Sequence, residues 1–200
     1  MNLILASKSP RRKEILENLG VKFDIITLET DENTDETTPE GYVEEIALRK
    51  GEAVRQKLLT EDALCSNTVI LSCDTVVVSP DGEIMGKPHD RADAKKMLLS
   101  YSGRVHSVIS GIALLGKDTC ITAHEVTYVY FDKVNESVID RYLDTDEPYD
   151  KAGAYAIQGM ASLWIDKIDG DYFNVVGLPT KKVSDTLKSG FGIDLSAFIE

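Results

Sequence analysis

The segment Thr68 to Val78, TVILSCDTVVV, constrains the fold more than any other part of the sequence. Its β-branched and aliphatic side chains form a near-continuous apolar run, which is typical of a strand covered on both faces. Asp74 lies in the middle, and a carboxylate in apolar surroundings is unfavourable unless it is paired, protonated or bound to a metal. Aspartate and threonine side chains often hydrogen-bond nearby backbone groups. This stretch alone leaves that local explanation and a functional carboxylate equally open.

The N-terminal segment predicts an anion-binding turn. An apolar strand at residues 2–6 is followed by SKSPRR and an amphipathic helix. Ser9 is expected to cap this helix, and Pro10 suits its first turn. Arg11 and Arg12 place positive charge beside a helix N-terminus, where cations are unfavourable and anions are favoured. Two solvated arginines are the simpler explanation, but the order strand, turn, helix favours an anion site.

The remaining periodicities predict a mixture of helices and strands. We expect helices at residues 40–59, 90–100, 135–143 and 180–188, the last of these stopped by Gly190, and strands at residues 21–28, 104–115, 119–131 and 162–168, with a loop at residues 170–179. Thr38 is expected to cap the first of these helices. The pattern predicts an α/β fold with a mixed twisted sheet wrapped by helices. The length predicts a single domain over residues 1–200, with two lobes around a cleft.

The composition narrows the classes of partner. A formal net charge of -12 argues against a broad surface for nucleic acid or membrane, although a small basic pocket for one anion remains compatible with it. Three cysteines without metal-type spacing make a disulfide framework unfavourable and predict a reducing, cytoplasmic location. Apolar runs of membrane-spanning length are absent from the sequence.

Several polar residues are candidates for a functional site. In the acidic segment 29–39, Asp31 or Glu32 lies close enough to the preceding strand to reach a cleft, while the rest is expected to be solvated. Lys50 borders the inner face of its helix, a position that often holds a lysine reaching for solvent. Lys87, between Gly86 and Pro88, is presented rigidly, although a plain turn has the same pattern.

Five motifs together resemble one known family. They are LASKSPRR at residues 5–12, CDTV at 73–76, GKP at 86–88, DKAGAYAIQG at 150–159 and GDYFNVVGLP at 170–179. In their order and spacing the chain closely resembles the Maf, or septum-formation-inhibitor-like, nucleotide pyrophosphatases. The resemblance implies a fold like that of the inosine-triphosphate pyrophosphatases. It also implies hydrolysis of nucleoside triphosphates to the monophosphate and pyrophosphate with a divalent cation, Mg²⁺ or Mn²⁺.

The resemblance also implies roles for single residues. Asp74 corresponds to the general base, and Glu32 to a metal ligand beside it. The phosphate-binding groups correspond to Ser7, Arg11, Arg12, Lys50 and Lys87. The branch of dTTP/UTP pyrophosphatases has an arginine, a threonine and a glutamine at the positions of Arg12, Thr75 and Gln158. Lys8, Gly51 and Cys73 depart from the family pattern, and none of these departures removes a functional group.

The chemistry of these residues agrees with the implied reaction. Attack at the α-phosphorus needs a base for the water and cations for the spreading charge. The Gln158 amide can donate to O4 and accept from N3–H of uracil or thymine. A nucleoside triphosphate is thus the expected partner, in nucleotide-pool housekeeping with a link to division arrest, and a homodimer remains open. The alternatives are a non-catalytic division regulator and a pyrophosphatase for another nucleotide, such as methylated GTP or inosine triphosphate.

Overall fold

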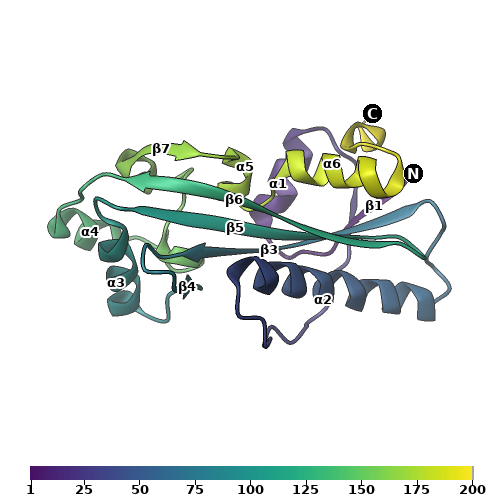
Figure 1. Cartoon of the computed structure of the whole chain (residues 1–200), viewed down its shortest axis with the longest axis horizontal. Coiled ribbons are helices and arrows are strands. Elements are labelled where there is room, and N and C mark those ends of the chain that lie inside the picture. The colour runs from purple at the N-terminus through teal and green to yellow at the C-terminus, as the bar shows by residue number, and fades with distance from the viewer. Residues whose placement is uncertain (200) are drawn as a thin grey trace. The chain divides into compact units, whose positions relative to one another are not determined.

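The computed structural model describes residues 1–199 and alternates strands with helices (Figure 1). The strands are β1 Asn2–Leu5, β2 Asp24–Ile25, β3 Thr68–Val78, β4 Ile84–Met85, β5 Val105–Leu115, β6 Cys120–Phe131 and β7 Ile165–Asp169. The α-helices are α1 Pro10–Asn18, α2 Pro39–Thr60, α3 Arg91–Tyr101, α4 Glu136–Tyr142, α5 Tyr172–Val176 and α6 Thr180–Phe191. Short 3-10 helices lie at Ala152–Ala154, Met160–Trp164 and Leu195–Phe198. Within residues 1–199, the helices are too short or too polar to cross a membrane.

The strands form one mixed sheet. Their order is β2-β1-β3-β5-β6-β7, and β4 pairs with β3 outside this path. β1 runs parallel to β2 and to β3, whereas β4 is antiparallel to β3 and β7 is antiparallel to β6. β5 and β6 are joined by a tight turn in which the Gly116 amide donates to the Thr119 carbonyl over 2.8 Å. The predicted α/β class and the predicted hairpin are therefore confirmed.

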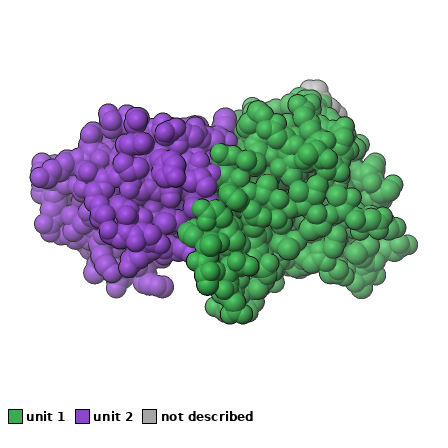
Figure 2. All heavy atoms as spheres, in the orientation of Figure 1, with its two compact units in different colours: residues 1–74, 110–125, 177–200 green, residues 75–109, 126–176 purple. Residues whose placement is uncertain are grey.

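The chain divides into two compact units (Figure 2). Unit 1 contains residues 1–74, 110–125 and 177–200, and unit 2 contains residues 75–109 and 126–176. Three of the four boundaries fall inside β3, β5 and β6, and the fourth follows the end of α5 at Val176. The single domain and the cleft stay predictions, and Glu200, the last residue of that domain, lies outside the described residues.

Unit 1 is organised by the close approach of α2 to the sheet. A Cβ at Gly111 in β5 would overlap the Val43 carbonyl of α2 and lie 2.6 Å from the Glu44 amide nitrogen. A Cβ at Gly51 in α2 would lie 2.6 Å from the hydroxyl oxygen of Ser72 in β3. That buried hydroxyl donates to the Ala47 carbonyl of α2 over 2.6 Å. Because protein cores tolerate little extra volume, these contacts fix the height of α2 above β3 and β5.

Unit 2 has an aromatic core. The rings of Tyr101, His106, Phe131 and Tyr155 pack against one another with centroids 4.4–6.1 Å apart. A hydrogen bond of 2.7 Å joins His106 Nε2 to the Tyr155 hydroxyl. Burial lowers the pKa of His106 to about 3, so its imidazole is neutral at physiological pH. Tyr155 belongs both to this core and to the segment 150–159, so the core anchors that segment.

The C-terminal part of the chain differs from the sequence prediction. The predicted strand at residues 162–168 is a 3-10 helix followed by β7, and the predicted loop at 170–179 contains α5. α5 forms because Asp171 accepts from the Phe173 amide and Asn174 turns inward to the Val108 carbonyl. α6 continues through Gly190, because this glycine allows close packing on Ile121, and it ends at Gly192, where φ is +69°.

Two smaller predictions at the N-terminal end are also wrong in part. The strand predicted at residues 21–28 is reduced to Asp24–Ile25. Ser9 occupies the N-cap position of α1, but its side chain accepts no capping hydrogen bond. Its amide donates to the Ser7 hydroxyl instead, over 3.3 Å. Thr38, in contrast, caps α2 as predicted by accepting from the Gly41 amide over 3.2 Å.

We predict that Gly111→Ala lowers the free energy of unfolding by about 3 kcal/mol or more, because the new methyl group meets backbone atoms of Val43 that cannot rotate away. Urea denaturation followed by circular dichroism measures the change. Gly86→Ala is the control, since a Cβ there meets no described atom within 4 Å. Equal denaturation midpoints for Gly111→Ala and the parent would contradict the close approach of α2.

Candidate functional site

Two carboxylates of unit 1 converge on one lysine. The Lys50 ammonium donates to Asp74 Oδ1 over 2.7 Å and lies 2.8 Å from Glu32 Oε1. The side chains of Lys50 and Asp74 are only 21% and 15% exposed, whereas Glu32 is 57% exposed. Burial alone would lower the pKa of Lys50, but the charges and hydrogen bonds of Asp74 and Glu32 outweigh it and hold this pKa above its ordinary value. The charged form of Lys50 is therefore stabilised.

Asp74 is presented by a strand that is buried on either side of it. The β3 residues from Thr68 to Cys73 and from Val76 to Val78 are buried, and only Asp74 and Thr75 are partly open. Asp74 Oδ1 is held by Lys50, while Oδ2 makes no hydrogen bond with any residue among 1–199. The local explanation, in which the carboxylate binds neighbouring backbone groups, is therefore not what the structure shows. One oxygen of Asp74 is anchored and the other is available.

Arg49 holds the loop that carries Glu32. Its guanidinium donates to the carbonyl of Asn33 and, over 3.5 Å, to that of Asp31, while its Nε lies 2.7 Å from Glu45 on α2. The Asp31 carboxylate turns back to accept from the Asn33 amide over 3.0 Å. Of the two acidic candidates in this loop, the structure therefore brings Glu32 to Lys50 and Asp74, and directs Asp31 into its own loop.

The turn after β1 holds Ser7 and Arg12 together. Ser7 is buried, and its hydroxyl accepts from Arg12 Nη1 over 3.0 Å. Arg12 Nε donates to the Gly177 carbonyl over 2.8 Å, and Cys73 Sγ lies 3.4 Å from the same oxygen. Gly177 has φ of +124°, which favours glycine. Arg11 precedes Arg12 in the first turn of α1 and is partly buried. Arg12 is thus held by the Ser7 hydroxyl and the Gly177 carbonyl.

The other predicted site residues belong to unit 2. Thr75 follows Asp74 directly in β3, and Lys87 and Gln158 are exposed. The segments of Lys87 and Gln158 are tied together, because the Gly153 amide donates to the Gly86 carbonyl over 2.9 Å. The structure therefore brings Ser7 to Arg12 and Glu32 to Lys50 and Asp74 in unit 1, and links the Lys87 and Gln158 segments in unit 2.

Tyr42 is a site residue that the sequence analysis missed. Burial raises the pKa of the Tyr42 hydroxyl, and the nearby charges of Asp74 and Glu32 raise it further. Tyr42 precedes Lys50 on α2 by eight residues, about two helical turns, so the two share one helix face. The spacing of Tyr42 and Lys50 in the sequence could therefore have indicated that Tyr42 lies near Lys50. Lys8, whose role the sequence left unassigned, forms an exposed ion pair with Glu29.

Glu32 and Asp74 also fit a divalent cation. Clusters of three or more metal-ligating side chains are absent from residues 1–199. Two carboxylates nevertheless suffice for Mg²⁺, which keeps several waters and takes further oxygens from substrate phosphates. The common position of Lys50 shows that both carboxylates can face one cation. The donor set of this site therefore fits a metal ion that is completed by a phosphorylated ligand.

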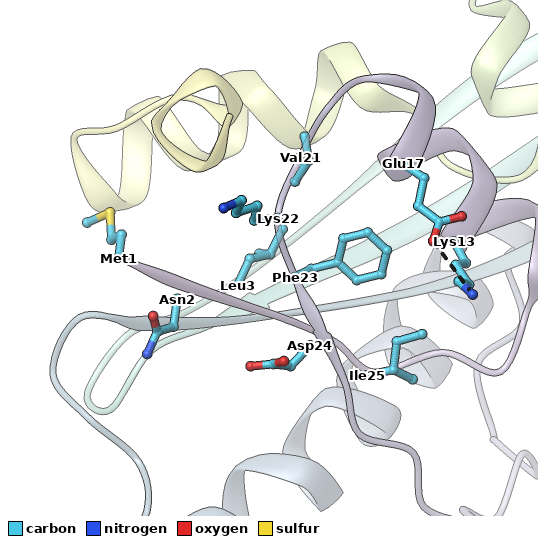
Figure 3. A pocket seen from close by; sticks show the side chains of 10 residues that line it. All are labelled: Met1, Asn2, Leu3, Lys13, Glu17, Val21, Lys22, Phe23, Asp24 and Ile25. Carbon is cyan, nitrogen blue, oxygen red and sulfur yellow. Dashed lines mark ion pairs between the residues drawn. The ribbon is translucent and has the colours of Figure 1, made fainter. Parts of the chain in front are cut away.

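A separate hollow in unit 1 contains none of these residues (Figure 3). It is lined by Met1, Asn2, Leu3, Lys13, Glu17, Val21, Lys22, Phe23, Asp24 and Ile25. Figure 3 shows Lys13 and Glu17 paired at its rim, with an Nζ to Oε1 distance of 3.6 Å. Its mixed charges and the absence of a buried polar group give it no resemblance to the carboxylate and lysine cluster.

The arrangement of cations and paired carboxylates is that of a protein that handles phosphorylated ligands. The chain belongs to the family described as Maf-like protein, whose profile matches residues 2–190. This confirms the resemblance inferred from the five motifs, and it places both units inside one family match.

Curated relatives match over nearly the whole chain. Proteins named dTTP/UTP pyrophosphatase are 44% identical in Thermoanaerobacter sp. (strain X514) and 46% identical in Clostridioides difficile (strain 630), covering 98% of this chain and 100% and 98% of their own. One from Alkaliphilus metalliredigens is 47% identical over 96% of this chain and 98% of its own. Among solved structures, the Staphylococcus aureus Ham1 protein covers 66% of this chain and 72% of its own, with a TM-score of 0.46 and 16% identity.

We predict that Lys50→Met lowers the free energy of unfolding by about 1.5–3 kcal/mol at neutral pH, because two carboxylates lose a charged hydrogen-bond donor. The pKa of Lys50 is raised by folding, so its contribution is complete below the ordinary value of 10.5 and declines as the pH rises above it. Urea denaturation from pH 7 to 11 should show the gap between parent and variant closing. Lys13→Met, which removes an exposed pair with Glu17, should change stability by less than about 0.5 kcal/mol. A gap that stays constant to pH 11 would exclude the assignment.

Proposed function

We propose that this protein hydrolyses dTTP and UTP to the monophosphate and pyrophosphate. The observation that carries the proposal is the convergence of Glu32, Lys50 and Asp74 in a chain of the Maf-like family. Full-length relatives named dTTP/UTP pyrophosphatase support the choice of nucleotides. The proposed setting is cytoplasmic housekeeping of the nucleotide pool.

Asp74 is the general base in this proposal. Its Oδ1 is anchored by Lys50, and its Oδ2 accepts a proton from the attacking water. Anchoring one oxygen fixes the direction of the other, which is what a base in an in-line displacement requires. The water then attacks the α-phosphorus, and the bond from that phosphorus to the bridging oxygen of the leaving pyrophosphate breaks.

The cations bind the triphosphate. Arg12 is pre-oriented by Ser7 and Gly177, so little conformational freedom is lost when its guanidinium also contacts a phosphate. Lys50 lies beside Asp74, the proposed general base, and its positive charge stabilises the negative charge that develops during the displacement. The remaining phosphate contacts are proposed for Arg11 and Lys87.

A divalent cation, Mg²⁺ or Mn²⁺, is proposed between Glu32 and Asp74. When bound, the cation supplies positive charge that neutralises phosphate oxygens and holds the substrate in place. Glu32 is the more exposed of the two carboxylates, so its side chain can adjust to the cation while Arg49 holds its loop and Asp74 stays in β3.

Gln158 and Thr75 are proposed to read the base, together with Arg12. The Gln158 side chain is exposed and makes no hydrogen bond with any residue among 1–199, so its amide is available to a ligand. An amide donates to O4 and accepts from N3–H, which uracil and thymine share. Guanine presents a different pattern of donors and acceptors. Its binding would leave polar groups of the site unpaired, so guanine nucleotides are expected to bind less tightly.

Incubation of the pure protein with a panel of nucleotides tests the proposal. With Mg²⁺ or Mn²⁺, dTTP and UTP should be hydrolysed faster than GTP, ATP, methylated GTP and inosine triphosphate, and pyrophosphate should be the first product. Chelation by EDTA should abolish turnover. Orthophosphate as the first product would place the attack at the γ-phosphorus, and a lack of turnover on the whole panel would favour a non-catalytic division regulator.

We predict that Asp74→Asn remains folded and loses about 10²–10⁴-fold in kcat on dTTP, because the amide cannot accept the proton of water. Steady-state kinetics and the thermal midpoint should be measured on the same sample. Asp24→Asn removes an exposed carboxylate of β2 as a control and should keep the parent kcat. Near-parent turnover by folded Asp74→Asn would eliminate Asp74 as the base.

A further inference from the structure

We propose that Glu147 is a positioning residue that fixes the segment carrying Gln158 and thereby sets the discrimination between bases. The inference rests on the proposed function, because it assigns Glu147 an effect through the proposed base-reading residue. All the contacts that carry it lie within unit 2.

The two oxygens of the Glu147 carboxylate bind partners that precede and follow the segment 150–159 in the chain. Oε1 accepts from the Tyr142 hydroxyl over 3.0 Å, and Oε2 accepts from the Met160 amide over 3.2 Å. Met160 follows Gln158 by two residues. A carboxylate is the one short side chain that offers an acceptor in both directions at once. Glu147 therefore joins the buried end of α4 to the backbone beside Gln158.

Gly159 lies directly against this carboxylate. A Cβ at Gly159 would overlap Glu147 Oε1 and lie 2.6 Å from Oε2. The backbone at Gly159 therefore lies so close to the Glu147 carboxylate that a side chain at this position would displace it. The need for glycine here is a packing requirement, since Gly159 is not among the glycines with positive φ.

Tyr142 completes the connection on the other side of Gln158. Its side chain is fully buried, and burial raises its pKa, with the charge of Glu147 raising it further. The hydroxyl is therefore protonated and donates to Glu147. The Ala156 amide, two residues before Gln158, lies near the same oxygen and lowers this pKa slightly. Glu147 holds the backbone at residue 160, and Tyr142 lies beside residue 156.

The result is a fixed backbone around a free amide. The Gly159 amide donates to the Ala156 carbonyl over 3.1 Å, which closes a turn around Gln158. The Lys151 ammonium donates to the Glu147 carbonyl over 3.1 Å and joins Glu147 to the start of the segment. A fixed backbone keeps the Cα of Gln158 in one place, so the amide can reach only a base edge that lies at a matching distance. Glu147 provides that fixation without touching the base.

Glu147→Gln tests the inference with little change in volume. Its amide has one acceptor oxygen and no charge, so it cannot accept from both the Tyr142 hydroxyl and the Met160 amide as the carboxylate does. We expect kcat/KM for dTTP to fall about tenfold, mainly through KM, as for loss of one hydrogen bond to a charged group. The ratio of kcat/KM for dTTP to that for GTP should fall with it. Asp146→Asn removes the neighbouring exposed charge and should keep the parent ratio.

A double-mutant cycle separates positioning from general stability. In a Gln158→Ala background, Glu147→Gln should change the dTTP to GTP ratio by less than about twofold, because the group it positions is gone. Equal loss of activity on dTTP and GTP with an unchanged ratio would overturn the inference, as would a full effect in the Gln158→Ala background. Absence of dTTP and UTP hydrolysis by the parent would overturn the proposed function, and the inference with it. An active parent with an unchanged ratio in Glu147→Gln overturns the inference alone.

Discussion

The close approach of α2 to β3 and β5 sets the geometry on which the site depends. Lys50 can reach Asp74 only because the helix lies low on the sheet, and it lies low because Gly51 and Gly111 present no side chain there. Because α2 lies so close to β3, the Ser72 hydroxyl can donate a hydrogen bond to the Ala47 carbonyl of the helix. Gly51, which departs from the family pattern in the sequence, packs against Ser72, and the ion pair of Lys50 and Asp74 therefore depends on the close contact of α2 with β3 and β5.

The parts of the fold that were predicted from the sequence are those with strong local patterns. β3, α2, α3 and the hairpin of β5 and β6 have long apolar periods and clear caps or turns. The predictions were wrong where contacts between distant parts of the chain override the local sequence pattern. Gly190 reads as a helix stop, but it serves the packing of α6 on Ile121. α5 forms within a glycine-rich segment because Asn174 finds a buried acceptor in β5, which no local pattern reveals.

The sequence indicated which residues belong to the candidate site, but not how these residues contact one another. Asp74 was identifiable because a lone carboxylate interrupts an apolar strand. The family resemblance pointed to Glu32, but the residue pattern alone left the choice between Asp31 and Glu32 open, because it depends on Arg49 fixing the loop from α2. Gly177 and Glu147 were equally hidden, since both act through a carbonyl or carboxylate that contacts the backbone or side chains of distant segments. Motifs identify groups that meet a ligand better than groups that hold other residues in place.

One boundary between the units falls between Asp74 and Thr75, so the proposed general base belongs to unit 1, whereas Gln158, one of the proposed base-reading residues, belongs to unit 2. In the proposed function, the carboxylates and cations around Asp74 act on the triphosphate, which all the candidate substrates share. Gln158, Tyr142 and Glu147 belong to unit 2 and are the residues proposed to influence the choice of base. Discrimination is a difference between binding free energies, so it can change through the second set while the first set stays intact. Under the proposed function, a chain with residues divided in this way can keep one reaction while the recognised base varies.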